Sequence, residues 1–362
     1  MYTPKQTEKK VQEKLLKNVK KKITQTQKEN LDKSITLEEM EKAVWNLKKE
    51  KTPGPDGIPT EFYQNFWGLL KNNYFKFIQQ VKITAFPKGK NASITTLLYK
   101  EKGEIYLLVN YRPVSLMNVD VKILTKTLAS RLNYVLPTII HQYQTAVYGR
   151  KIHNTIHLVR DLIQMANEHN EEAAMVFLDQ EKAFDRVNHR FLFDTMKEFG
   201  LGESFIDWVK IIYSNAETRI NINGFLTEPI ALKSGLRQGC PLSPLLYVMI
   251  IEILALQLRS NPNIIGFTVE GEKIISSHYV DDAVIKITQN KCFKEVYKEL
   301  KDYEKATGAK MNYQKTKGLW LGKWKDRKDD PFQECYEMWR SWKGNIFILE
   351  PHRSLCQPCF TR

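Results

Sequence analysis

Apolar residues recur along the chain with two spacings, one typical of helices and one typical of strands. The helical spacing is found at residues 34–47, 61–83, 120–136, 154–166, 190–199, 205–213, 243–258 and 293–306. Short apolar or alternating runs predict strands at residues 95–99, 173–178, 219–223, 273–280 and 283–288. Helices are mixed with short strands of a length suited to antiparallel pairing, which indicates the α+β class.

Polar residues and glycines mark where several of these elements begin and end. Ser34 or Thr36 is the expected N-cap of the first helix in that series. Gly200 is expected to stop a later helix, and the Asn223-Gly224 pair predicts a hairpin turn. The local signals therefore agree with the periodicity.

The longest apolar run extends from Leu245 to Leu258 and is interrupted by Glu252 and Gln257. A helix that crosses a bilayer needs ~20 apolar residues. The run is therefore predicted to be a buried core helix, and no membrane is expected as a partner.

Charge narrows the class of partner. Lys and Arg total 55 against 41 Asp and Glu, which gives a formal net charge of +14. An excess of this size favours nucleic acid first and an anionic membrane surface second. Within residues 1–34, Val11, Leu15, Val19 and Ile23 predict a basic amphipathic helix, and a solvated charged leader is the equal alternative.

The cysteines indicate the redox compartment of the protein rather than a catalytic or metal-binding site. The chain has five of them and no apolar secretory leader, which favours a reducing, intracellular location over a disulfide framework. Cys356 and Cys359 form a CxxC pair after His352. A tetrahedral zinc site needs four ligands, and no second pair is available, so we expect no metal there.

Carboxylates stand at the ends of predicted strands. Asp179 follows an apolar run, and Asp281 and Asp282 lie between two short strands. A tight hairpin holds carboxylates at one sheet edge, where another from a neighbouring strand meets them. Such oxygen ligands suit Mg²⁺, and two ions clamp the attacking and leaving oxygens of a phosphoryl transfer. A lone Asp-Asp pair is more often a simple turn, and on the residues alone this alternative stays open.

Seven motifs follow one another in order along the chain. Three come first, at residues 53–57 (PGPDG), 110–116 (NYRPVSL) and 144–150 (QTAVYGR). Four follow, at residues 177–185 (FLDQEKAFD), 234–244 (SGLRQGCPLSP), 279–282 (YVDD) and 308–317 (GAKMNYQKTK). The later four resemble motifs A, B, C and D of reverse transcriptases, most closely those of LINE-type non-LTR retrotransposons, and the earlier three resemble that family's fingers motifs. The resemblance covers residues 35–325.

The resemblance implies a polymerase right-hand fold within the α+β class, with helical fingers and an antiparallel-sheet palm backed by helices. It divides the chain into a basic leader (1–34), fingers with the fingers–palm junction (35–170), a palm (171–325) and a tail (326–362). Relatives carry a helical thumb after the palm. The tail does not resemble one, so we expect a truncated or frameshifted copy there.

The resemblance also implies catalytic roles. Asp179, Asp281 and Asp282 correspond to the catalytic carboxylates. Lys315 corresponds to the lysine that protonates the leaving pyrophosphate. Asp185 looks like a further metal candidate, but by analogy it is structural.

A cofactor follows from the same comparison. Asp179, Asp281 and the backbone carbonyl of Gln180 are the expected ligands of two Mg²⁺ ions, for which Mn²⁺ is a substitute. These are hard oxygen ligands of the kind that Mg²⁺ takes together with substrate phosphates.

Five residues are expected to bind the nucleotide. Phe184 corresponds to a bulky wall under the incoming sugar that excludes a 2′-hydroxyl, with an ordinary core phenylalanine as the alternative. Gln238 and Gly239 resemble the motif B loop that contacts nucleotide and template. Lys100 and Arg112 are candidates for triphosphate contacts, or else surface positions.

The implied activity is RNA-directed DNA polymerisation on an RNA template from a DNA primer and dNTP, in the nucleus and cytoplasm. Tyr279-Val280 stands where LINE enzymes usually carry Phe-Ala. Two alternatives remain, a catalytically weak or inactive nucleic-acid-binding remnant of a retroelement and an RNA-directed RNA polymerase. The latter enzymes generally lack a bulky aromatic residue at the position of Phe184. The host, the template RNA and the oligomeric state are left open.

Overall fold

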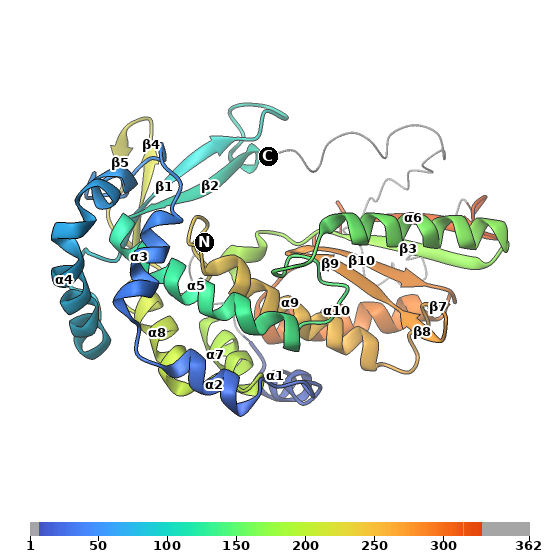
Figure 1. Ribbon diagram of the computed structural model, residues 1–362. Coiled ribbons are helices and arrows are strands. Elements are labelled where there is room, and N and C mark those ends of the chain that lie inside the picture. Colours follow the sequence, from blue (N-terminus) through green and yellow to red (C-terminus); the bar gives the residue numbers. More distant parts are fainter. Residues whose placement is uncertain (1–6, 314, 328–362) are drawn as a thin grey trace.

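Two separate β-sheets organise the structure, a computed structural model that describes residues 7–313 and 315–327. One sheet, which we call the fingers sheet, has the strand order β2-β1-β4-β5, and β6 pairs with β4. The other, the palm sheet, has the order β11-β3-β10-β9. In the view of Figure 1 the fingers sheet lies on the left and the palm sheet on the right, with helices joining them below. The architecture is the α+β class that the sequence predicts.

The fingers sheet combines strands that are distant in the sequence. β1 (Ala92–Tyr99) pairs antiparallel with β2 (Tyr111–Met117) and parallel with β4 (Glu217–Ile222). β5 (Phe225–Leu226) and β6 (Ile230–Ala231) both pair with β4. Strands from the predicted palm thus complete the sheet of the predicted fingers, and the boundaries between leader, fingers and palm stay predictions.

In the palm sheet, β3 (Glu172–Leu178) is flanked on both sides by antiparallel strands. It pairs with β11 (Lys317–Gly322) and β10 (Asp282–Ile287), and β10 pairs with β9 (Ser276–Tyr279). A separate ribbon joins β7 (Phe267–Val269) and β8 (Glu272–Ile274). The single strand predicted at residues 273–280 is therefore wrong, because β8 and β9 belong to different sheets.

Helices cover both faces of the palm sheet. α6 (Ile152–Glu168) lies over one face, and α9 (Ser243–Ser260) and α10 (Cys292–Thr307) lie over the other (Figure 1). Successive β3 side chains point to opposite faces. Val176 accordingly joins the core around α9 and α10, whereas Met175 packs in the cluster under α6.

α9 is apolar on all sides because protein surrounds it. Among the described residues it is the one helix long and apolar enough to cross a membrane, and 78% of it is buried inside the fold. Glu252, which interrupts the apolar run, is paired within the fold with Arg259. The predicted buried core helix is confirmed.

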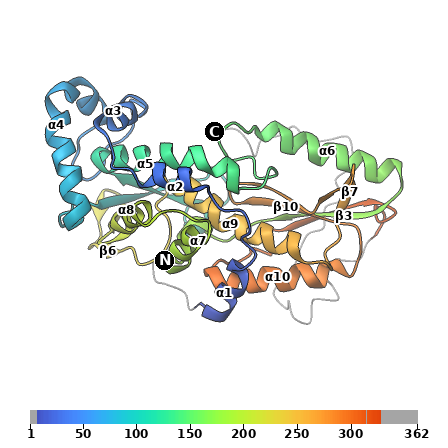
Figure 2. The ribbon, with the colours of Figure 1, turned by 60° about the horizontal axis from the view of Figure 1, so that its bottom comes forward.

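Five further helices match the predicted segments closely: α3 (Leu37–Trp45), α4 (Thr60–Thr84), α5 (Val119–Ile139), α7 (His189–Glu198) and α8 (Glu203–Tyr213). The helix α2 (Gln25–Asp32) and the short 3₁₀ turns η1 (Leu108–Asn110) and η2 (Ala183–Arg186) were not predicted. The helices α5, α7, α8 and α9 pack against one another as a group that we call the helical layer (Figure 2). Gly200 adopts a φ of 87° just after α7, in the left-handed region that ends helices.

The N-terminal segment differs from both predictions made for it. α1 (Lys9–Leu16) is helical, but the chain is not helical over residues 17–24. Val19 and Ile23 are nonetheless buried, and the Ile23 amide donates to the Phe199 carbonyl at 3.0 Å. The segment is therefore neither one long amphipathic helix nor a solvated leader, because its non-helical part buries Val19 and Ile23 and bonds to the residue that follows α7.

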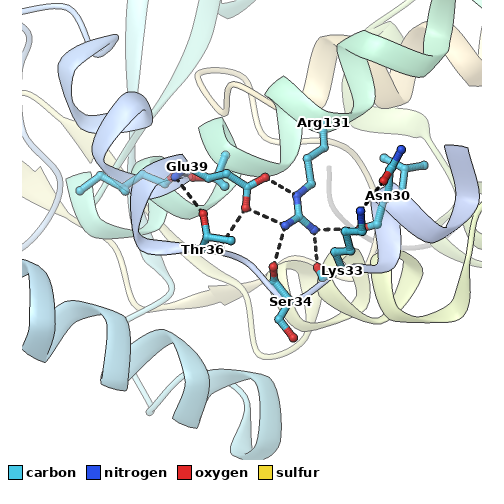
Figure 3. A network of polar contacts seen from close by, with 9 residues as sticks. Asn30, Lys33, Ser34, Thr36, Glu39 and Arg131 are labelled. Carbon is cyan, nitrogen blue, oxygen red and sulfur yellow. Dashed lines mark hydrogen bonds and ion pairs between the residues drawn. The ribbon is translucent and has the colours of Figure 1, made fainter. Parts of the chain in front are cut away.

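Arg131 of α5 ties the N-terminal segment to the helical layer (Figure 3). Its guanidinium donates to both carboxylate oxygens of Glu39, each at 2.6 Å, and to three backbone carbonyls, those of Leu31, Lys33 and Ser34. Glu39 also completes a capping box with Thr36, which is the N-cap of α3. Of the two caps that the sequence left open, the structure selects Thr36.

Cys356, Cys359 and His352 lie outside the described residues, as does the tail from residue 328 onward. The two cysteines within the described part, Cys240 and Cys292, are both buried free thiols.

Candidate active site

Three aspartates meet at one end of the palm sheet. Asp179 directly follows β3, and Asp282 is the first residue of β10. The antiparallel register pairs Leu178 with Ala283, which sets Asp179 opposite Asp282. Asp281 precedes Asp282 in the turn between β9 and β10. Strand pairing thus brings together residues that are far apart in the sequence.

Burial raises the pKa of each of these carboxyl groups, and repulsion by neighbouring carboxylates raises it further for Asp281 and Asp282. Burial is the main cause for Asp179. For Asp281, burial and then the charge of Asp179 raise the pKa. For Asp282, the most exposed of the three, burial and the charges of its two neighbours raise the pKa to about 6. Carboxylates that repel one another in this way favour a bound cation, which neutralises the excess charge.

Basic side chains from separate elements adjoin the carboxylates. Lys100 follows β1, Arg112 lies in β2, and Lys315 precedes β11. Burial and then the charges of Lys315 and Arg112 lower the pKa of Lys100, whereas the charge of Asp179 raises it. The charge of Lys315 partly opposes the rise in the pKa of Asp179, and the charge of Arg112 partly opposes the rise in the pKa of Asp281. These mutual effects place the three cations within electrostatic range of Asp179 and Asp281.

The donor atoms fit a divalent cation. Asp179 and Asp281 provide carboxylate oxygens, and no described residue donates a hydrogen bond to the backbone carbonyl of Gln180. Within residues 7–313 and 315–327, no three His, Cys, Asp or Glu side chains lie close enough to hold a metal between them. Two carboxylates and one carbonyl leave other positions to water and substrate oxygens, which is how Mg²⁺ usually binds.

The loop that carries Lys315 is bound directly to Asp179. The Asn312 amide donates to the Asp179 carbonyl at 2.7 Å, and the Asp179 amide donates to Thr316 Oγ1 at 3.4 Å. The Lys315 amide donates to the Asn312 carbonyl at 3.1 Å. Lys315 is therefore held beside the carboxylates by contacts of its neighbours.

Phe184 is placed by an aromatic stack. It lies in η2, is only partly buried, and stacks on Tyr247 of α9 with ring centroids 4.8 Å apart and planes at 17°. The Tyr247 hydroxyl donates to Gln180 Oε1 at 2.9 Å. Phe184 is thus not a fully buried core residue, and its ring is backed by a buried partner that also contacts a predicted ligand residue.

The loop with Gln238 and Gly239 is fastened to the fingers sheet. The Ser115 amide of β2 donates to the Gln238 carbonyl at 2.9 Å. Gly239 has a φ of 110°, and a Cβ there would stand 2.6 Å from the Ser115 carbonyl, so only glycine fits. Arg237 donates to Asn91 Oδ1 at 2.8 Å and to the Asn91 carbonyl at 2.6 Å. The loop is therefore attached to the fingers sheet at β2 and at the residue that precedes β1.

Asp185 stays apart from the carboxylates. It is 4% exposed, and burial raises its pKa to about 6. Its charge does not contribute to the pKa shifts of Asp179, Asp281 or Asp282. The structure therefore favours the structural role over a metal-binding one.

Comparison with known proteins identifies the family. The sequence model of the family described as reverse transcriptase (RNA-dependent DNA polymerase) matches residues 99–333. The chain belongs to the reverse transcriptase family. It is similar to the transposon TX1 uncharacterized 149 kDa protein of Xenopus laevis, with 36% identity over 307 residues, which is 83% of this chain.

Further relatives come from other retrotransposable elements. This reverse transcriptase is 27% identical over 228 residues to the Pol polyprotein of the type-2 element R2DM of Drosophila melanogaster, which is 62% of this chain. It is 25% identical over 280 residues, or 74% of the chain, to the RNA-directed DNA polymerase from mobile element jockey of Drosophila funebris. The chain spans 23%, 20% and 29% of the TX1, R2DM and jockey proteins, so these relatives are much longer.

The reverse transcriptase motifs did not indicate every residue that shapes the site. Tyr247, Asn312 and Thr316 contact predicted site residues, yet the sequence assigned them no role. Gln144 lies in a recognised fingers motif, but only the structure shows that its side chain reaches the turn of Asp281.

Proposed function

We propose that this reverse transcriptase chain is the RNA-directed DNA polymerase region of a non-LTR retrotransposon. In the reaction the primer 3′-hydroxyl attacks the α-phosphorus of a dNTP paired with the RNA template. The hydroxyl proton passes to water as a bond forms between the primer oxygen and the α-phosphorus. The bond from the α-phosphorus to the oxygen that bridges to the β-phosphate breaks, and pyrophosphate leaves. The observation that carries the proposal is the site where Asp179 and Asp281 adjoin Lys100, Arg112 and Lys315.

Each charged group has a task in this reaction. Two Mg²⁺ ions, or Mn²⁺ in their place, stabilise charge on the attacking and leaving oxygens when bound, and Asp179, Asp281 and the Gln180 carbonyl would hold them. Lys315 donates a proton to the pyrophosphate oxygen as the bond breaks. Lys100 and Arg112 bind the triphosphate, because cations at the end of the fingers sheet face the carboxylates.

Residues around the sugar and base set the choice of substrate. Phe184, supported from behind by Tyr247, would meet a 2′-hydroxyl and so exclude ribonucleotides. Gln238 and Gly239 lie in a loop anchored to β2, where the backbone approaches closely. This arrangement favours a DNA polymerase over an RNA-directed RNA polymerase.

The proposed partners are an RNA template, a DNA primer and dNTP. The net charge of +14 supports binding to phosphate backbones, which should weaken as salt rises. Action on nucleic acids agrees with a location in the nucleus and cytoplasm. Burial accounts for the apolar character of α9, so no membrane partner is proposed.

Primer extension tests the proposal. The full chain is incubated with a DNA primer on an RNA template, dNTP and Mg²⁺ at low salt, with EDTA as the control. We expect incorporation with Mg²⁺ and with Mn²⁺ and none with EDTA, and a preference for dNTP over rNTP. No incorporation at high enzyme concentration would show that the chain is a binding remnant, and a preference for rNTP would show that it is an RNA polymerase.

A further inference from the structure

The turn that carries Asp281 has a strained backbone. Val280, the residue before Asp281, has a φ of 54°. This left-handed region is unfavourable for a side chain branched at Cβ. Such a conformation persists only where the surrounding structure holds it in place.

Gln144 supplies contacts that hold this turn. Its side chain comes from the connection between α5 and α6 and is 1% exposed. Gln144 Oε1 accepts hydrogen bonds from the amides of Val280 at 3.2 Å and Ala146 at 3.1 Å. Gln144 Nε2 donates to the Val280 carbonyl at 3.4 Å. One amide group thus contacts both the N–H and the C=O of the strained residue.

The backbone around Gln144 pairs separately with β9. The Thr145 amide donates to the His278 carbonyl at 3.0 Å, and the His278 amide donates to the Tyr143 carbonyl at 2.8 Å. These bonds do not need the Gln144 side chain. A substitution at Gln144 therefore removes the contacts to Val280 and leaves the attachment of the segment to β9.

We propose that Gln144 is a positioning residue for the catalytic carboxylates, because its amide fixes the Val280 peptide and thereby holds Asp281 at the end of the sheet beside Asp179. The consequence for catalysis rests on the proposed function. The effect on the turn and on cation binding does not, so the two can be separated by experiment.

The chain offers a matched control two residues away. Gln142 is exposed, and its side chain donates to Glu272 at 2.7 Å, away from the turn. The variants Gln144→Leu and Gln142→Leu make the same chemical change in the same segment. Gln144→Glu keeps an acceptor for the Val280 amide but has no donor for the Val280 carbonyl, and it serves if the leucine variant fails to fold.

Two measurements report on the turn without relying on activity. Hydrogen–deuterium exchange of peptides that cover residues 276–283 reports on the turn itself, with peptides from α9 as the internal reference for folding. Mn²⁺ binding to the full chain, followed by electron paramagnetic resonance, reports on the carboxylates. We expect Gln144→Leu to speed exchange in the turn at least tenfold and to weaken Mn²⁺ binding at least fivefold, while Gln142→Leu matches the wild type.

Activity provides a further separation. If the chain extends primers, Gln144→Leu should lower kcat and raise the Mg²⁺ concentration for half-maximal rate, with the KM for dNTP and the Kd for primer–template unchanged. A loss of folded protein alone would lower kcat without changing the Mg²⁺ requirement. If neither protein extends primers but exchange and Mn²⁺ binding change as expected, the proposed function fails and the role of Gln144 stands.

A second variant tests whether the strain at Val280 is the reason that the turn needs Gln144. Val280→Gly removes the strain, because glycine adopts a positive φ without a penalty. In the Val280→Gly background, Gln144→Leu should change exchange in the turn and Mn²⁺ binding by a smaller factor than it does in the wild type. Two results would overturn the inference. One is that exchange and Mn²⁺ binding in Gln144→Leu stay within twofold of the wild type. The other is that the effects of the two substitutions on exchange and Mn²⁺ binding simply multiply in the double variant.

Discussion

Replacing Asp281 by asparagine separates catalysis from folding and from nucleic-acid binding. The change keeps the size of the side chain and removes one of the two carboxylate charges proposed to hold cations. Two unit charges at ~4 Å interact by ~4 kcal/mol at an effective dielectric constant of ~20. Losing that stabilisation in the transition state lowers the rate by about a thousandfold.

The same change should not destabilise the fold. Burial and the charge of Asp179 raise the pKa of Asp281, so its ionised form is unfavourable in the metal-free protein. A carboxyl whose pKa is raised by folding stabilises the fold only at low pH, and this contribution is lost as the pH rises through the folded-state value. Near pH 7.5 without metal, Asp281→Asn should therefore have a Tm equal to or above that of the wild type.

The assay combines single-nucleotide incorporation, thermal unfolding and primer–template binding on the same preparations. Asp161→Asn, which removes an exposed carboxylate on α6, is the matched control and should resemble the wild type. Affinity for primer–template should hardly change in either variant, because it depends on lysine and arginine contacts to phosphates. Equal incorporation by the wild type and Asp281→Asn, or a marked fall in the Tm of the variant, would refute the reasoning.

Three other predictions concern single side chains. Phe184→Val should reduce the preference for dNTP over rNTP by ~1–3 kcal/mol. Tyr247→Phe keeps the stack but removes the hydroxyl, so it should leave this preference unchanged. Equal discrimination by Phe184→Val and the wild type would make Phe184 an ordinary packing residue. Lys315→Gln should lower kcat about a hundredfold in rapid-quench measurements with little change in the KM for dNTP, and a loss confined to KM would instead indicate a role in triphosphate binding. Burial raises the pKa of Asp185 to about 6, so wild-type stability should fall as the pH rises from about 4 through about 6. Asp185→Asn should then be more stable than the wild type at pH 8 by up to about 3 kcal/mol, at ~1.4 kcal/mol per pKa unit, and nearly equal to it at pH 4. Denaturant unfolding at the two pH values measures this difference in stability. A stability advantage of the variant that does not grow with pH would contradict the prediction.

Most of the helices from α3 onward, the central strand β3 and the kind of chemistry could be predicted from the sequence alone. These follow from local features, since helical spacing and caps act over a few residues and motifs are contiguous. Thr36 and Glu39 form the capping box from neighbouring positions, and the order of the motifs indicated the reverse transcriptase family that the comparisons establish.

Two edge strands, β2 and β11, were not predicted, because each contains a residue that disfavours a strand in isolation. β2 contains Pro113, which is tolerated because β2 lies at the edge of the fingers sheet. β11 contains Gly318 and likewise lies at the edge of the palm sheet. In both cases the pairing with a distant strand, rather than the segment's own propensity, makes the strand.

The assembly of the site depends on packing between elements that are distant in the sequence. The parallel pairing of β1 with β4, the stack of Phe184 on Tyr247 and the contacts of Gln144 to Val280 all join segments that are distant in the sequence. No local pattern encodes them, because each depends on the direction and register with which whole elements pack. Motif order therefore indicated which residues carry the chemistry, and long-range packing decided which other side chains hold those residues in position.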